Sequence, residues 1–260
     1  MTFTFRKAVR EQTPLLIGLV GPSGSGKTLS ALRLAKGIQS VRRGKMVGID
    51  TEARRMLHYA DHFDFEHMEF TPPFGSDRYS EALVAAAEEC ENGVVIVDSM
   101  SHEHEGAGGY LETHEFELDR MAGDDYKKRD RMTFTAWIKP AAARRRLINK
   151  ILQLNCAFVF CFRAKEKLKI MRGAEPIQLG WQAIAGDEFA FEMTVRCLLP
   201  AGAGGIPDWS QDAFQLGVPK LPKDLRGAFT DGARIDEKTG LFLAEWASGM
   251  KKPVTDNLPL

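Results

Sequence analysis

The sequence predicts an α/β protein built on a mainly parallel central sheet with helices on both faces. Three observations indicate this class. Short apolar runs alternate with amphipathic stretches along the first 200 residues, as strands and helices do in parallel sheets. The apolar run 15–20 leads directly into a glycine-rich loop and then into an amphipathic stretch. The 260 residues, 44% of them hydrophobic, supply one such domain with a substantial core and leave little room for two.

Each expected strand is a short apolar run, and each expected helix has apolar residues recurring on one face. Asn92-Gly93 ends one helix, and Pro140 opens another. Arg144 falls within the buried face of that later helix, where it either reaches the rim or pairs with a carboxylate. The expected strands are 15–20, 45–50, 66–70, 94–98, 156–162 and 189–199, and the expected helices are 28–39, 53–60, 77–91 and 140–154.

The amino-acid composition of the sequence changes after residue 200. Residues 201–205 are all alanine or glycine, which is typical of a flexible link, and 206–230 are rich in turn residues. Residues 231–249 predict one short strand and a helix, and 251–260 a loose tail. We therefore expect a core over 1–200 and a C-terminal appendage with a tail over 201–260.

Charge and cysteine content narrow the function classes. The 35 basic and 35 acidic residues cancel, so contact with nucleic acid depends on local basic patches. The four cysteines form no C-x-x-C pair, and three lie in apolar segments, which favours buried thiols over disulfides or zinc. The sequence has no run of about 18 apolar residues and no signal-peptide pattern at its start. We expect a soluble, cytoplasmic protein without membrane contact.

The loop after the first strand carries the pattern G-x-x-x-x-G-K-T, which predicts a nucleotide-phosphate site. Its glycines let the backbone turn tightly and aim N–H groups at phosphate oxygens. Lys27 brings a positive charge to the β- and γ-phosphates, and Thr28 offers a hydroxyl to Mg²⁺. The helix that follows places its positive end beneath the phosphates. We expect ATP to contact Gly21, Pro22, Ser23, Gly24, Ser25, Gly26, Lys27, Thr28 and Leu29.

Two acids complete the expected site. Asp98 ends an apolar strand, as a carboxylate that positions Mg²⁺ with Thr28 does, although acids at strand ends are common. Many ATPases with such a loop have a catalytic glutamate directly after this aspartate. Here Ser99 stands in that position, so the catalytic base must come from elsewhere. Glu52 closes the second strand at the expected phosphate edge, where it can deprotonate the attacking water. The alternative for Glu52 is a carboxylate at a helix start, and Glu103 or Glu105 would then be candidates for the base.

The order of the phosphate loop, the "IDTE" strand end (49–52) and the "VVIVDS" strand (94–99) resembles the RecA-type recombinase core over roughly residues 10–200. More closely, the chain is similar to bacteriophage ATPases of the AAA family, some of them minimal RecA-core proteins of single-strand annealing. The resemblance implies a RecA-like P-loop NTPase fold with the sheet order 66–70, 45–50, 94–98, 156–162, 15–20, 189–199. It also implies that Arg163, after the central strand, occupies a sensor position that feels the γ-phosphate.

The run 163–172 is the strongest local concentration of basic residues. By the resemblance it occupies the second DNA-binding loop, where Lys165, Lys167, Lys169 and Arg172 would neutralise DNA phosphates. An ordinary exposed hairpin, turning at Gly173 and returning through 176–179, fits the alternating pattern equally well. A basic side chain here could instead reach a neighbouring subunit's nucleotide, as an arginine finger does.

The polar insertion 101–135 matches the first DNA-binding loop by position. Lys127, Lys128 and Arg129 form a second basic cluster there, with Tyr126 and Phe134 nearby for base stacking. The alternative is a solvated helix face, which charge runs usually are.

Taken together, these features predict a Mg²⁺-dependent ATPase of phage type that acts in DNA recombination or single-strand annealing, within a bacterial host. Lys27, Glu52, Asp98 and Arg163 are its expected catalytic residues. ATP and Mg²⁺ are the expected cofactors, and single-stranded DNA is the expected partner. A homo-oligomer with nucleotide at subunit interfaces stays open. So do two other functions: a motor for DNA packaging or helicase loading, and a P-loop small-molecule kinase, which Glu52 disfavours because it suits water as the acceptor.

Overall fold

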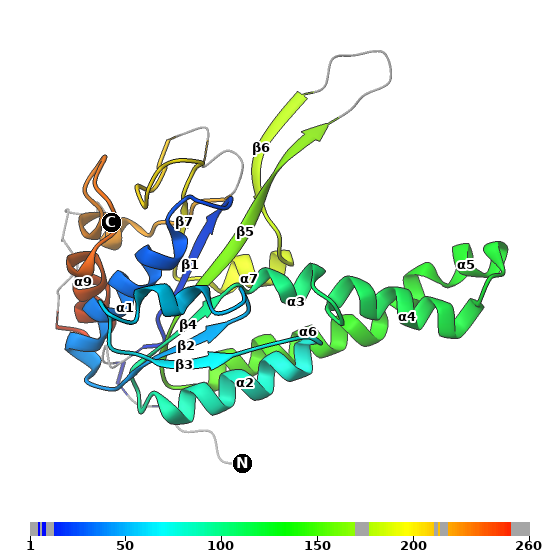
Figure 1. Cartoon of the computed structure of the whole chain (residues 1–260), viewed down its shortest axis with the longest axis horizontal. Helices are drawn as coiled ribbons and strands as arrows, with labels where there is room; N and C mark the ends of the chain where they lie inside the picture. The colour runs from blue at the N-terminus through cyan, green and yellow to red at the C-terminus, as the bar shows by residue number, and fades with distance from the viewer. Residues whose placement is uncertain are drawn as a thin grey trace.

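A seven-stranded sheet with helices on both faces forms the centre of the described structure, which is a computed structural model (Figure 1). It describes residues 13–169, 177–210 and 218–250, together with residues 5, 7, 8 and 213. For 167–169 and 177–179 the description covers the backbone alone. The sheet and its flanking helices confirm the predicted α/β class with a mainly parallel sheet.

The strands follow the order β3-β2-β4-β5-β1-β7, with β6 paired to β5 outside this path. All pairs along the path are parallel, and the β5–β6 pair is antiparallel. This is the order that the resemblance implied. The strands are β1 (Leu16–Gly21), β2 (Met46–Asp50), β3 (Glu66–Glu69), β4 (Val94–Asp98), β5 (Ala157–Lys169), β6 (Ile177–Ala183) and β7 (Val195–Leu198).

Successive residues of the central strands point to opposite faces, because the side-chain period of a strand is two. Val95 and Val97 of β4 join one apolar core, whereas Val94 and Ile96 join the other. Helices α2 (Ser76–Glu89) and α6 (Ile138–Gln153) cover the first core, and α1 (Lys27–Arg42) and α9 (Glu237–Ala247) cover the second. Both faces of the sheet are thus buried, as parallel sheets require.

Described residues beyond 200 pack against α1, the helix that follows the glycine-rich loop. Helices α1 and α9 approach so closely that a Cβ on Gly37 would lie 2.0 Å from the Glu237 oxygen, so glycine is needed there. Arg33 pairs with the Glu237 carboxylate at 2.9 Å, and Asp236 caps α9 through the amide of Thr239. Leu225, in the short helix η2 (Lys223–Ala228), is buried in the same core.

The structure corrects three expected elements. Of the short strand and helix expected over 231–249, only the helix α9 forms, and 231–236 are turn and irregular backbone. The strand expected over 189–199 is a helix, α7 (Asp187–Glu192), followed by the shorter strand β7. Gly186 is extended and caps α7, and Asp187 and Glu188 favour the positive end of its first turn. The helix expected over 53–60 is the shorter 3-10 turn η1 (Arg55–Tyr59), and it cannot start at Ala53 because Ala53 and Arg54 both adopt left-handed conformations, with φ of 55° and 64°.

Two projections leave the body of the molecule (Figure 1). One is the ribbon formed where β5 continues past the sheet and pairs with β6, so the hairpin expected near 163–179 exists, although Arg172 and Gly173 lie outside the described residues. The other is a helical arm. The polar insertion 101–135 forms α3 (Ser101–Glu105), α4 (Tyr110–Ala122) and α5 (Tyr126–Ala136), so its basic cluster lies on a solvated helix, as the alternative stated.

Two expectations based on sequence composition, on the cysteines and on membrane-spanning segments, can be compared with the structure. Cys90, Cys156, Cys161 and Cys197 are buried free thiols, as expected. In the described part of the chain, no helix combines the length and apolar character needed to cross a membrane.

Candidate active site

The glycine-rich loop after β1 leads the chain into the N-terminus of α1. Gly24 and Gly26 adopt left-handed conformations, with φ of 75° and 92°. At Gly26 a side chain is also excluded by space, because its Cβ would lie 2.6 Å from the backbone nitrogen of Gly205. Gly205 in turn donates its N–H to the backbone carbonyl oxygen of Ser25 at 2.9 Å. The glycine-rich loop is therefore fixed in part by Gly205, which follows the last strand of the sheet, β7.

Lys27 occupies the mouth of this loop. Its ammonium group donates hydrogen bonds to the carbonyl oxygens of Gly21 and Pro22, both at 2.8 Å. Burial lowers the pKa of Lys27, although the negative charges of Asp98 and Glu52 act in the opposite direction. A half-buried cation at the N-terminus of α1 gives the loop a preference for an anion.

Thr28 and Asp98 meet at the carboxyl edge of the sheet. The Thr28 hydroxyl donates to an Asp98 carboxylate oxygen at 2.5 Å, joining the start of α1 to the end of β4. Asp98 is only 3% exposed, and burial raises its pKa even though the Thr28 bond counteracts it. A hydroxyl and a carboxylate are hard oxygen donors of the type that Mg²⁺ prefers, so these two residues fit that ion.

Glu52 is presented by a turn that Asp50 organises. Asp50 accepts the N–H of Glu52 at 2.8 Å through one carboxylate oxygen and the N–H of Met56 at 2.9 Å through the other. His67 of β3 lies 3.2 Å from the second oxygen. Sequence reasoning missed this role of Asp50, although an aspartate that bonds to a backbone amide two residues on is a known turn signal.

Arg163 reaches across the sheet edge to Glu52. Its guanidinium donates to both carboxylate oxygens, with nitrogen–oxygen distances of 2.8 and 2.7 Å. Burial would raise the pKa of Glu52, but the hydrogen bonds and charge of Arg163 outweigh it and lower that pKa. The same bonds raise the pKa of Arg163. Glu52 is therefore an ionised carboxylate, and the alternative of a helix-start carboxylate does not describe its contacts.

The strand register explains why these distant residues meet. Asp50 of β2 pairs with Asp98 of β4, and Gly21 of β1 pairs with Arg163 of β5. The strand ends are tied together further by Thr51, whose hydroxyl oxygen accepts the Ser99 N–H at 2.6 Å. The parallel strands thus end at one level and deliver their final side chains to one edge, as open parallel sheets do.

One cavity of about 590 Å³ contains these groups. It unites the expected Ser23, Gly24, Gly26, Lys27, Thr28, Leu29, Glu52, Asp98 and Arg163. It is also lined by Glu105, the reserve candidate for the base, and by residues that no motif indicated: Arg55, Tyr59, Ala164 and Ile184. Gly21 and Pro22 contribute carbonyl oxygens to Lys27, and Ser25 is buried behind the loop.

Of the two reserve candidates for a base, Glu105 lines the cavity, whereas Glu103 is buried elsewhere. Both carboxylate oxygens of Glu103 accept hydrogen bonds from Arg144, the shorter at 2.8 Å. The Ser76 hydroxyl donates to the same carboxylate at 2.6 Å. Of the two arrangements expected for Arg144, the structure shows the pair with a carboxylate. This Arg144–Glu103 pair is buried in the core.

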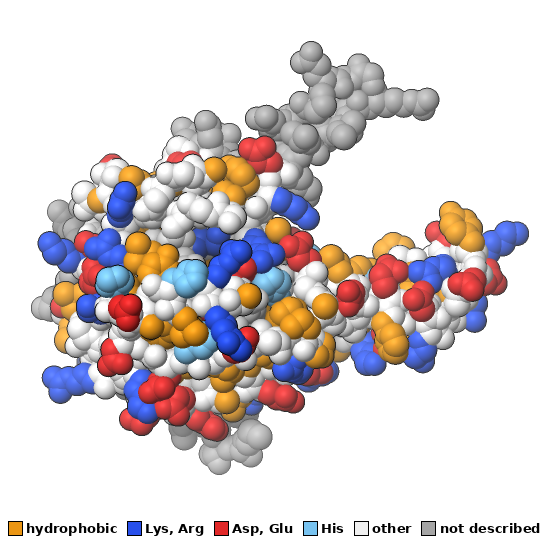
Figure 2. All heavy atoms as spheres, in the orientation of Figure 1, with side chains coloured by type: hydrophobic (Ala, Val, Ile, Leu, Met, Phe, Trp, Pro, Cys, Tyr) orange, Lys and Arg blue, Asp and Glu red, His pale blue; other side chains and the backbone are white. Residues whose placement is uncertain are grey.

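The expected DNA contacts lie outside this cavity. Lys165 is exposed on the β5–β6 ribbon, and Lys167 and Lys169 follow on the backbone of β5. Lys127 and Lys128 are exposed on α5, at the arm seen on the right of Figure 2. Arg129, in contrast, pairs with Asp119 and with Glu115 of α4. Its charge is therefore largely balanced within the arm.

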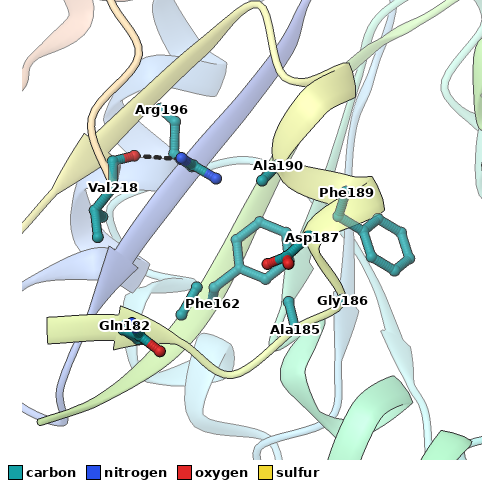
Figure 3. A pocket seen from close by; sticks show the side chains of 10 residues that line it. Phe162, Gln182, Ala185, Gly186, Asp187, Phe189, Ala190, Arg196 and Val218 are labelled. Carbon is teal, nitrogen blue, oxygen red and sulfur yellow. Dashed lines mark hydrogen bonds between the residues drawn. The ribbon is translucent and has the colours of Figure 1, made fainter. Parts of the chain in front are cut away.

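A second cavity, of about 240 Å³, lies on the other side of β5 (Figure 3). Phe162, Gln182 and Asp187 line it, and Arg196 donates to the Val218 oxygen at its edge. It contains no part of the phosphate loop and so is separate from the candidate active site.

Comparison with known proteins adds no family to this description: the sequence matches no protein-family model, and no curated protein matches it. The chemistry of the site therefore rests on the geometry of its own residues.

Proposed function

We propose that this chain is a Mg²⁺-dependent ATPase of the RecA-like, phage type that acts on single-stranded DNA in recombination or annealing. One observation carries the proposal. A single cavity at the carboxyl edge of parallel strands combines a phosphate loop, the Thr28–Asp98 pair and an ionised Glu52. These are the parts that phosphoryl transfer to water requires: an anion cradle, a metal position and a proton acceptor.

The loop would bind the triphosphate through backbone N–H groups at the start of α1, which have no partner within the helix. Lys27 would exchange the two carbonyl oxygens it now contacts for phosphate oxygens. Leu29 and Tyr59 supply the apolar lining on which the nucleoside would lie. Thr28 and Asp98 would hold Mg²⁺, and this ion, when bound, neutralises charge on the phosphates.

Glu52 would act on the attacking water. The water oxygen forms a bond to the γ-phosphorus, the bond from that phosphorus to the bridging oxygen breaks, and Glu52 takes the proton. ADP and inorganic phosphate are the products. Both oxygens of Glu52 now accept bonds from Arg163, and this pairing lowers the pKa of Glu52, so release of the guanidinium would make the carboxylate a stronger base. A γ-phosphate offers Arg163 the alternative anion, and its guanidinium would then stabilise negative charge there.

The β5–β6 ribbon would connect this chemistry to DNA. Arg163 belongs to the strand that carries Lys165 two residues later, and Lys167 and Lys169 continue along it. Charges on such a ribbon can neutralise DNA phosphates without reading bases. Because the strand is continuous, a change in the partner of Arg163 alters the start of the DNA-binding segment directly.

The decisive experiment measures ATP turnover with and without single-stranded DNA over a series of salt concentrations. We expect ATP turnover that requires Mg²⁺ and rises with single-stranded DNA. We expect this stimulation to be lost as the salt concentration increases. No stimulation by DNA, but stimulation by a protein of the DNA-packaging or helicase-loading kind, would favour the motor alternative. Phosphate transfer that needs an added small-molecule acceptor would favour a kinase.

A further inference from the structure

Helix α5 is held by very little of its own protein. Of its eleven residues only Ala136 is buried. Helices in proteins are stabilised mainly by packing an apolar face, and short helices without such packing are marginal in water. The α4–α5 arm, defined as residues 110–136, extends away from the body (Figure 1). This arm therefore has an incomplete core.

Large aromatic side chains of the arm point into solvent. Phe134 of α5 is 87% exposed, Tyr126 is 82% exposed, and Phe116 of α4 is 63% exposed. Exposed apolar groups that gather on one element mark interaction surfaces. In Figure 2 apolar side chains lie among acidic and basic ones along this arm.

The two helices of the arm carry opposite charges. Helix α4 has four acidic residues and one arginine, so its formal charge is −3. Helix α5 has four basic residues and one acid, so its charge is +3. On α4, Phe116 is flanked at helical spacing by Glu112 and Asp119. The exposed face of α4 thus carries an aromatic side chain between two acidic ones.

Helix α5 presents the complementary arrangement. Phe134 lies on the same face as Arg131 and Lys127, three and seven residues earlier. Both basic side chains are exposed. An aromatic residue that follows two bases on α5 complements an aromatic residue between two acids on α4. The arm is therefore complementary to another copy of itself.

We propose that the α4–α5 arm is an assembly surface that pairs with the arm of a second copy of this chain. A two-fold axis running along the arms brings each α4 against the partner's α5, making two equivalent contacts. The four helices then form a bundle whose core includes Phe116, Tyr126 and Phe134. The acidic and basic borders lie opposite each other and fix the pairing.

A second copy fits the whole arm better than DNA does. DNA phosphates would be attracted by α5 but repelled by the acids of α4, whereas a second arm satisfies both helices. Arg129 is already paired with Glu115 and Asp119, which reduces the positive charge available to DNA. The pairing requires no nucleotide, so its test is independent of the ATPase proposal.

The first test measures the molar mass of the purified full chain by light scattering and sedimentation, from about 1 to 100 µM, where weak dimers dissociate. We expect the mass of a dimer at the upper end. Phe134→Ser should return the mass to that of one chain and leave the melting temperature of the monomer unchanged. The matched control is Phe191→Ser on α7, which is 75% exposed but lies outside the arm and should keep the dimer.

The second test exchanges charges. One variant carries Lys127→Glu, Lys128→Glu and Arg131→Glu, and the other carries Glu112→Lys and Glu115→Lys. Asp119 stays in place so that Arg129 keeps a partner. Each variant alone should be monomeric because its own arms repel. An equimolar mixture should recover the dimer mass, since acidic arms then face basic ones.

Three results would overturn the proposal. One is a monomeric wild type throughout this concentration range. Another is a dimer whose mass none of the arm variants changes. The third is an α5 variant that keeps the wild-type mass but loses affinity for a labelled single-stranded oligonucleotide, which would assign α5 to DNA instead.

Discussion

Arg163 and Glu52 form a two-bond ion pair in the cavity at the carboxyl edge of the sheet, although 111 residues separate them in the chain. The pair joins the strand that leads into the ribbon to the carboxylate that we propose acts on water. A ligand that draws Arg163 away from Glu52 would also free the carboxylate. The contact lies where the cavity meets the start of the ribbon.

Glu52→Gln is expected to bind ATP normally and to reduce turnover by about 10²-fold or more, the usual effect of removing a general base. Glutamine keeps the size of the side chain but accepts no proton. The measurement combines single-turnover hydrolysis with a nucleotide-binding titration. Normal hydrolysis by this variant would move the base to Glu105, which lines the same cavity.

Arg163→Gln is expected to shift the acid limb of the kcat/KM profile, which reports the free enzyme, to higher pH. Arg163 lowers the pKa of Glu52, so the wild-type carboxylate stays ionised and active down to a lower pH than an unpaired one. Without the guanidinium, protonation begins sooner as pH falls. The control is the Glu52→Gln/Arg163→Gln double variant, whose residual activity should lack this shift. An unmoved acid limb in Arg163→Gln would separate Glu52 from the pH dependence.

Lys27→Ala is expected to abolish ATP hydrolysis and to weaken nucleotide binding, because the cavity loses its phosphate-facing cation. The matched control is Lys36→Ala, which removes an exposed lysine further along α1. Nucleotide binding by calorimetry and phosphate release report the two effects. If a folded Lys27→Ala protein turns over like the control, the loop is not the phosphate site.

Replacing Lys165, Lys167 and Lys169 with alanine is expected to lower affinity for all single-stranded DNA sequences alike. Three fewer phosphate contacts should flatten the slope of log affinity against log salt by about 2. ATP binding without DNA should remain, because Lys27, Thr28 and Asp98 are intact. Fluorescence anisotropy over a salt series measures the slope. An unchanged slope would leave the ribbon as a hairpin without DNA contacts.

Arg144→Ala is expected to destabilise the fold by about 3–5 kcal/mol, since it leaves the buried Glu103 carboxylate without its cation. Arg146→Ala on the same helix removes an exposed pair with Asp77 and should change stability by less than about 1 kcal/mol. Urea unfolding of both variants measures the difference. Equal stabilities would mean that Ser76 alone satisfies Glu103.

Local patterns in the chain are sufficient to predict the glycine-rich turn between β1 and α1, most helices and strands, and the place of Asp98 at the end of β4. Each of these depends on neighbours within a few residues: a period of two or 3.6, a glycine that can adopt positive φ, or an acid after an apolar run. The same patterns fail at Phe189, because a short apolar run fits a helix and a strand equally. The extended Gly186 and the acids beside it decide for α7.

The partners of charged groups depend on the tertiary structure. Nothing near Glu52 in the sequence indicates Arg163, and nothing near Arg144 indicates Glu103. Both pairs exist because parallel strands and the helices above them bring together residues that are far apart in the chain. The close contact of Gly26 with Gly205 has the same origin, as does the choice of a helical arm for a polar stretch that also fits a loop. A side chain's partner is set by strand order and register, which arise from the whole sheet rather than from any one segment.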